Sequence, residues 1–221
     1  MTKSTKDILI SIAVTIGTLG LCYFFFKKKD DSSEVNYIPD NKIDELGNVI
    51  ISIPETKLES YPIIYVFGGI DYATPKWMLS QVPKEILYKS IVVFIPYTVS
   101  YDVAKHDVSK YLSGKGYKTN SVSIIGFSAG GTNVQKVYNN NFKFIGLIDP
   151  STSTPYLSLP FKPNTSMVYN DANWGGYPAI KSALPKLDSK ISLAGGDSEK
   201  VSLRHVDIPK YFFEKYKNQI V

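Results

Sequence analysis

Short runs of apolar, β-prone residues alternate with segments of helical spacing through most of this chain. The apolar runs cover residues 49–53, 62–67, 91–95, 121–127, 142–148, 166–169 and 190–194. Strands that are apolar on both faces are typical of a parallel sheet with helices on both sides. Segments of helical spacing lie between them, among them residues 104–112, 134–138 and 207–212. The sequence therefore predicts an α/β fold with a doubly wound, mostly parallel sheet, in which sites form at the carboxyl ends of the strands.

A glycine-flanked serine follows the run at residues 121–127. The chain reads Gly126-Phe127-Ser128-Ala129-Gly130-Gly131 at this point, and a helical segment comes next. A serine on a sharp turn between a strand and a helix projects its hydroxyl out of the sheet, and glycines relieve the crowding of such a turn. The start of the following helix offers free N–H groups to a developing oxyanion. This pattern predicts that Ser128 is a catalytic nucleophile.

Residues 121–138 resemble the nucleophile elbow of the α/β-hydrolase superfamily, and the resemblance extends from about residue 49 to the C-terminus. It implies α/β-hydrolase topology and an oxyanion hole with two backbone donors. One donor would be the N–H of Ala129, which follows the serine. The other would come from the loop after residues 62–67, from Gly69 or Ile70. Lipases and esterases often carry a histidine before the glycines of this loop, where this chain has Phe67.

The chain has two histidines, so the general base has two candidates. His106 falls on the helix before Ser128, opposite its apolar face, and we expect it to be a solvated surface residue. His205 precedes the last helix, where the resemblance places the base. A near-neutral imidazole can take the serine proton and return it to the leaving group. We therefore expect His205 to be the base.

Two aspartates compete for the third role. Asp171 follows the run at 166–169, at the commonest position of the acid in the superfamily. Asp149 ends the run at 142–148, and Ile148-Asp149-Pro150 resembles the acid-bearing turn of pancreatic-type lipases. The sequence favours Asp171, with Asp149 as the alternative. Two further aspartates are weaker candidates because they lie close to His205 in sequence, and one of them has a role as a helix cap: Asp197 and Asp207.

The N-terminal region is predicted to anchor the chain in a membrane. Residues 8–26 form an uncharged, largely apolar run that as a helix would be roughly 28 Å long, close to the hydrocarbon thickness of a bilayer. Aromatic residues end this run, and three lysines follow at 27–29, which favours a cytosolic C-terminal side. We expect an anchor over residues 1–29, a polar tether over 30–47 and a hydrolase domain over 48–221.

Composition narrows the possible partners. The formal net charge of +5 comes almost wholly from scattered lysines, since Arg204 is the only arginine, and this disfavours a nucleic-acid site. The single cysteine, Cys22, lies in the apolar N-terminal run, so neither an intramolecular disulfide nor a thiolate zinc site can form. We expect no metal and no cofactor.

The predicted function is that of a membrane-anchored serine hydrolase that cleaves an acyl ester, with a lipid ester suggested by its location. Only a short apolar flap over residues 151–164 follows Asp149, so the site should be open. Three aromatic residues are candidates to line it: Trp77, Trp174 and Tyr177. The alternative is a hydrolase-like structural or binding module without turnover. Such a module would normally have lost a triad residue, whereas here serine, acid and histidine stand in order.

Overall fold

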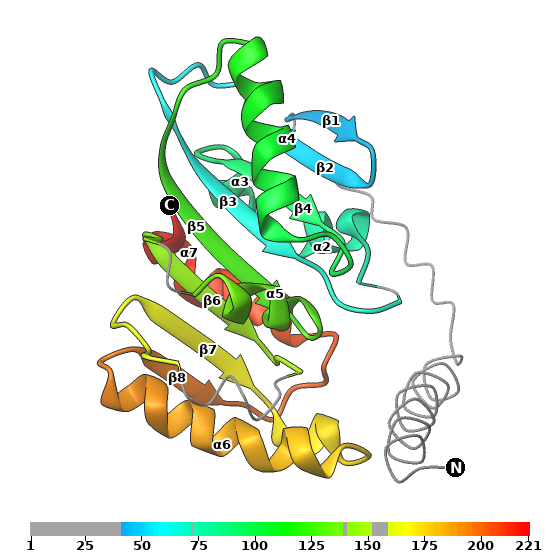
Figure 1. Cartoon of the computed structure of the whole chain (residues 1–221), viewed down its shortest axis with the longest axis vertical. Coiled ribbons are helices and arrows are strands. Elements are labelled where there is room, and N and C mark those ends of the chain that lie inside the picture. The colour runs from blue at the N-terminus through cyan, green and yellow to red at the C-terminus, as the bar shows by residue number, and fades with distance from the viewer. Residues whose placement is uncertain (1–40, 72, 139–140, 152–158) are drawn as a thin grey trace, which may run out of the picture. The chain divides into compact units, whose positions relative to one another are not determined.

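An eight-stranded, mostly parallel sheet organises the part of the chain that the computed structural model describes, namely residues 41–71, 73–138, 141–151 and 159–221. The sheet order is β1-β2-β4-β3-β5-β6-β7-β8 (Figure 1). The strands are β1 (Lys42–Leu46), β2 (Val49–Ile53), β3 (Tyr61–Phe67), β4 (Ile91–Ile95), β5 (Thr119–Phe127), β6 (Phe144–Ile148), β7 (Thr165–Tyr169) and β8 (Asp197–Lys200). β2 pairs antiparallel with both β1 and β4. The other strands are parallel to one another, in the order β4-β3-β5-β6-β7-β8.

Helices cover both faces of the sheet. One buried cluster joins the sheet to α4 (Tyr101–Gly114), α5 (Gly130–Lys136) and α6 (Pro178–Leu193). The other joins it to α2 (Pro75–Gln81), α3 (Lys84–Leu87) and α7 (Ile208–Ile220). In β3 successive side chains alternate between the clusters, with Tyr65 in the first and Val66 in the second. Figure 1 shows α4 in front of the sheet and α7 behind it. The doubly wound α/β prediction is confirmed.

The strand predicted at residues 190–194 is wrong. These residues form the end of α6 and the turn after it, because Leu184, Leu187 and Ile191 share the spacing of one helix face and are fully buried. The last strand is β8, whose sequence is Asp-Ser-Glu-Lys. It carries no apolar residue, since it lies at the edge of the sheet, so a search for apolar runs does not find it.

The tether predicted over 30–47 is too long, because an edge strand without an apolar run was again missed. Residues 42–46 form β1, a charged edge strand that pairs antiparallel with β2. Polar side chains at an edge discourage pairing with other chains. The other six predicted strands match β2 to β7 to within two residues at each end.

The predicted membrane span at 8–26 lies outside the described residues, as does the rest of the region 1–40. Within the described ranges, no helix combines the length and the apolar character that crossing a bilayer requires.

Candidate active site

Ser128 sits on a left-handed turn between β5 and α5. Its φ is +52°, a backbone conformation that non-glycine residues rarely adopt. Three backbone hydrogen bonds hold this turn: Ser128 N–H donates to the carbonyl oxygen of Ile148 (2.9 Å), and the Ser128 carbonyl accepts from the N–H groups of Gly131 and Ser151 (both 3.0 Å). The side chain is half-buried rather than enclosed in the core. The strand–turn–helix context predicted for the serine is present.

Glycines allow the chain to approach itself closely around this turn. A Cβ added at Gly126 would lie 2.5 Å from the carbonyl oxygen of Gly130. One added at Gly130 would lie 2.4 Å from the carbonyl oxygen of Phe67, at the end of β3. Contacts this short do not occur for real side chains, so both positions require glycine. The close approach brings the end of β3 against the start of α5.

The loop after β3 passes directly beside the serine. A Cβ added at Gly69 would lie 3.0 Å from Ser128 Cβ. Ile70 is the next residue of this loop and is half-buried, and Ala129, at the start of α5, is 7% exposed. The three residues predicted for the oxyanion hole therefore lie on the two segments that meet at Ser128.

His205 lies in the loop between β8 and α7 and bonds to the buried Asp149. The distance between His205 Nδ1 and Asp149 Oδ2 is 2.6 Å. Asp149 follows β6 and has a φ of +39°, and its side chain is fully buried. Its backbone N–H donates to the Val168 carbonyl at 2.7 Å, which ties this turn to β7. A buried carboxylate on Nδ1 fixes the imidazole orientation and leaves Nε2 for chemistry.

Three further N–H donors surround the Asp149 carboxylate. The Asn170 backbone N–H donates to Oδ1 at 3.0 Å, Trp174 Nε1 donates to Oδ1 at 3.1 Å, and Asn173 Nδ2 donates to Oδ2 at 2.9 Å. With His205, the carboxylate therefore takes part in four hydrogen bonds. Such a set compensates a buried negative charge without a full counter-cation.

Asp171, the acid that the sequence favours, lies elsewhere. Its carboxylate pairs with Lys200 Nζ at 2.9 Å near the exposed edge of β8, and this ammonium lowers the pKa of Asp171. The prediction that Asp171 bonds to His205 is therefore wrong. The structure places the alternative, Asp149, in hydrogen-bond contact with His205. Asp171 begins the short helix η2 (Asp171–Trp174), which turns Asn173 and Trp174 toward Asp149.

Aromatic rings hold the His205 imidazole on two sides. Its ring centroid lies 4.6 Å from that of Phe127 and 5.2 Å from that of Trp174. Because Phe127 precedes Ser128 in the chain, the first contact brings His205 to the elbow. Trp77 packs on Phe127 at 5.6 Å, and Tyr177 packs on Trp174 at 5.9 Å. All three aromatic residues that the sequence suggested for the site thus belong to one set of contacts around His205.

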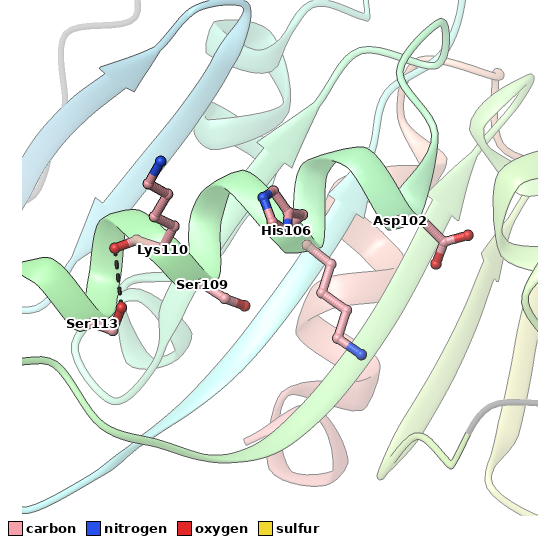
Figure 2. A pocket seen from close by; sticks show the side chains of 6 residues that line it. Asp102, His106, Ser109, Lys110 and Ser113 are labelled. Carbon is pink, nitrogen blue, oxygen red and sulfur yellow. Dashed lines mark hydrogen bonds between the residues drawn. The ribbon is translucent and has the colours of Figure 1, made fainter.

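The remaining predicted residues fall outside this arrangement. His106 is exposed on the outer face of α4, as predicted, beside an open hollow lined by residues of that helix (Figure 2). Asp197 contacts Tyr216 and Lys215 on α7, and Asp207 pairs with Arg204 instead of making the expected side-chain cap of α7. Residues 152–158 of the expected flap lie outside the described residues. In the described part of the chain, no three histidine, cysteine, aspartate or glutamate side chains converge as a metal site would require.

Asn170 and Asn173 are the residues of this site that sequence reasoning missed. Neither is a nucleophile, a base or an acid, and neither belongs to the elbow motif. The only local signal is that an asparagine at 170 precedes a short helix, which suggests a cap. The bonds to Asp149 depend on β6 and β7 lying side by side.

Comparison with known proteins shows a structural likeness without a detectable sequence relationship. No family model matches the chain, and no curated protein matches it. Among solved structures, an α/β serine hydrolase without a lid from Xanthomonas campestris has a TM-score of 0.55 at 11% identity, covering 82% of this chain and 96% of that one. A lipase/esterase from Lactobacillus plantarum has a TM-score of 0.51 at 13% identity, covering 81% of this chain and 97% of that one. Carboxyl esterase 2 from Tuber melanosporum has a TM-score of 0.50 at 15% identity, covering 87% and 89%.

Proposed function

The chain has the α/β-hydrolase fold, and from this premise we propose that it is a serine hydrolase that cleaves acyl esters with Ser128, His205 and Asp149. One observation carries the proposal: a serine with a φ of +52° stands at the end of β5, and His205, bonded to the fully buried Asp149, packs on Phe127, the residue before that serine. A strained backbone at a serine that is only half-buried is typical of a functional residue. The structural neighbours named as serine hydrolase, lipase/esterase and carboxyl esterase agree with this reaction class.

The reaction would proceed through an acyl-enzyme. Ser128 Oγ attacks the ester carbonyl while its proton passes to His205 Nε2, and the carbonyl oxygen becomes an oxyanion. The intermediate collapses, the bond to the alcohol oxygen breaks, and the alcohol leaves with the proton from His205. Water then attacks the acyl-enzyme and gives its proton to His205. The carboxylic acid leaves, and the proton returns to Ser128.

The oxyanion would be held by backbone N–H groups. Ala129 offers one from the start of α5, and Gly69 or Ile70 offers the second from the loop beside Ser128. Donors already in place need no reorganisation when the charge develops, and each contributes about 100- to 1,000-fold to the rate. Asp149 would hold the imidazole and stabilise its cation.

A fluorophosphonate probe tests the nucleophile. The Ser128 oxygen–phosphorus bond forms, the phosphorus–fluorine bond breaks, and fluoride leaves while His205 takes the proton. We expect Ser128→Ala to abolish labelling and to lower ester turnover by roughly 10⁶-fold. Ser113→Ala is the matched control, because Ser113 is an exposed serine on α4 that bonds to the Lys110 carbonyl (Figure 2). Equal labelling of the Ser128 variant would overturn the assignment and favour a binding module without turnover.

Membrane attachment and a lipid ester substrate form the finer part of the proposal. They rest on the uncharged run at residues 8–26 and the lysines at 27–29, which would place the hydrolase domain on the cytosolic side. The full chain should resist extraction from membranes by alkali, and a chain starting at residue 30 should be extracted but keep its turnover. Release of the full chain by high salt or alkali would contradict an integral span.

A further inference from the structure

Two asparagine residues connect the buried acid to the loop that carries His205. Asn173 Nδ2 donates to Asp149 Oδ2 at 2.9 Å and also to the carbonyl oxygen of Leu203 at 3.2 Å. Asn170 Nδ2 donates to the same Leu203 carbonyl at 2.8 Å, while the Asn170 backbone N–H donates to Asp149 Oδ1 at 3.0 Å. Leu203 stands two residues before His205. Both asparagines therefore bond at once to the acid and to the loop of the base.

The short helix η2 places the two amides next to each other. The Asn170 side-chain oxygen accepts from the backbone N–H of Ala172 at 3.0 Å, and the Asn173 backbone N–H donates to the Asn170 carbonyl at 3.1 Å. These bonds close the turn at the end of β7. The side-chain NH₂ groups of both residues bond to the Leu203 carbonyl.

The loop at residues 201–207 has no regular structure of its own. Its backbone is tied at the start by the bond from Val201 N–H to the Tyr169 carbonyl at 2.9 Å, and at the end by the start of α7. Between these points the Leu203 carbonyl accepts hydrogen bonds from the side-chain amides of Asn170 and Asn173. Because the same Asp149 oxygen bonds to Asn173 and to His205, Asn173 also restricts the rotation of the carboxylate.

We propose that Asn173, supported by Asn170, is a positioning residue that sets the distance and angle between the Asp149 carboxylate and the His205 imidazole. The inference rests on the proposed hydrolase function. Neither side chain is required to touch the substrate. Their effect reaches the reaction through His205, whose Nε2 must lie within hydrogen-bond distance of Ser128 Oγ during proton transfer.

A fall in kcat with little change in KM distinguishes this role from a purely structural one. Misplacement of a catalytic group by about 1 Å costs on the order of 100-fold in rate. For a small activated acetate ester, Asn173→Ala should lower kcat by roughly 100-fold and leave KM within about threefold. Asn173→Asp should lower kcat further, because it sets a carboxylate against Asp149 and against the Leu203 carbonyl. The rate of fluorophosphonate labelling should fall in parallel with kcat.

Two variants of neighbouring residues complete the design. Asn170→Ser keeps an oxygen that can accept from Ala172 N–H but is too short to reach Leu203, so it should lower kcat without unwinding η2. Asp171→Asn is the matched control in the same turn, because the Asp171 carboxylate bonds to Lys200 and not to Asp149 or Leu203, and its kcat should stay near that of the wild type. Thermal unfolding of each variant identifies loss of folded protein, and Asn170→Ser decides the matter if Asn173→Ala does not fold.

The outcomes separate the two proposals. If Ser128→Ala abolishes turnover but Asn173→Ala and Asn170→Ser keep near-wild-type kcat, the positioning role is overturned and the hydrolase function stands. A change in KM alone, or a loss of kcat equal to that of Asp171→Asn, also overturns it. If the wild type neither turns over esters nor reacts with the probe, both proposals are overturned together.

Discussion

Asp149 and Asp171 follow two neighbouring parallel strands of the sheet. Both lie at the carboxyl ends of these strands. Asp149 is fully buried and takes part in four hydrogen bonds with N–H groups, one of them from His205. Asp171 faces the edge strand β8 and pairs with Lys200, whose side chain is 54% exposed. Two carboxylates that look equivalent along the chain therefore have opposite surroundings.

The difference shows what separates a candidate catalytic acid from a surface acid. A buried carboxylate needs hydrogen-bond donors to offset the loss of water, and such a set of donors also fixes its orientation. Asp171 has an 18% exposed side chain and an exposed lysine as its partner, so water still reaches the pair and the pair contributes little to stability. Burial and donor set, rather than position after a given strand, are therefore the features that distinguish the two.

Within the comparison of the two aspartates, the largest expected effect comes from Asp149→Asn. Loss of the charge leaves the imidazole without its orienting acceptor and its cation without compensation, so kcat should fall by about 10⁴-fold. Asp171→Asn is the matched variant and should keep kcat within about threefold. Steady-state turnover of both variants checks the contrast. A collapse of kcat in the Asp171 variant with near-normal turnover in the Asp149 variant would reverse the comparison.

A smaller effect is expected from Trp174→Phe. This change removes the indole N–H that donates to Asp149 Oδ1 but keeps an aromatic ring against His205. A hydrogen bond to a charged group contributes about 1.5–3 kcal/mol, so the free energy of unfolding should fall by roughly that amount. We expect kcat to fall by about tenfold. Urea unfolding and ester turnover measure the two quantities, and Tyr177→Phe, which keeps the ring packed on Trp174, is the control.

The smallest effect concerns the Asp171–Lys200 pair. A double-mutant cycle with Asp171→Asn and Lys200→Met should give a coupling of at most about 1 kcal/mol, weakened by salt. Because Lys200 lowers the pKa of Asp171 in the folded state, the contribution is present above the unfolded pKa of about 3.9 and disappears as the pH falls through the lower folded value. Unfolding free energies at pH 7 and pH 3 test this. A coupling above 2 kcal/mol would show that Asp171 is more than a surface acid.

The fold was predictable wherever burial leaves a pattern in the sequence. Runs such as residues 91–95 are buried on both faces, so their apolar character identifies them as strands. The edge strands β1 and β8 were not predictable in this way, because exposed edges tolerate charged residues. Residues 190–194 were misassigned because a short apolar stretch can belong to a strand or to a buried helix face, and Leu184 and Leu187 decide for the helix.

The sequence by itself determined the α/β class and the strand–turn–helix context of Ser128, and it predicted that His205 rather than His106 lies beside that turn, since each depends on local spacing, on glycines or on the order of elements. Only the tertiary structure decided between the two aspartates and revealed Asn170 and Asn173. The physical reason is that the choice depends on donors brought together by neighbouring strands. Asp149 on β6 meets N–H groups from η2 after β7 and the imidazole from the loop after β8. No sequence pattern within a single segment predicts these contacts.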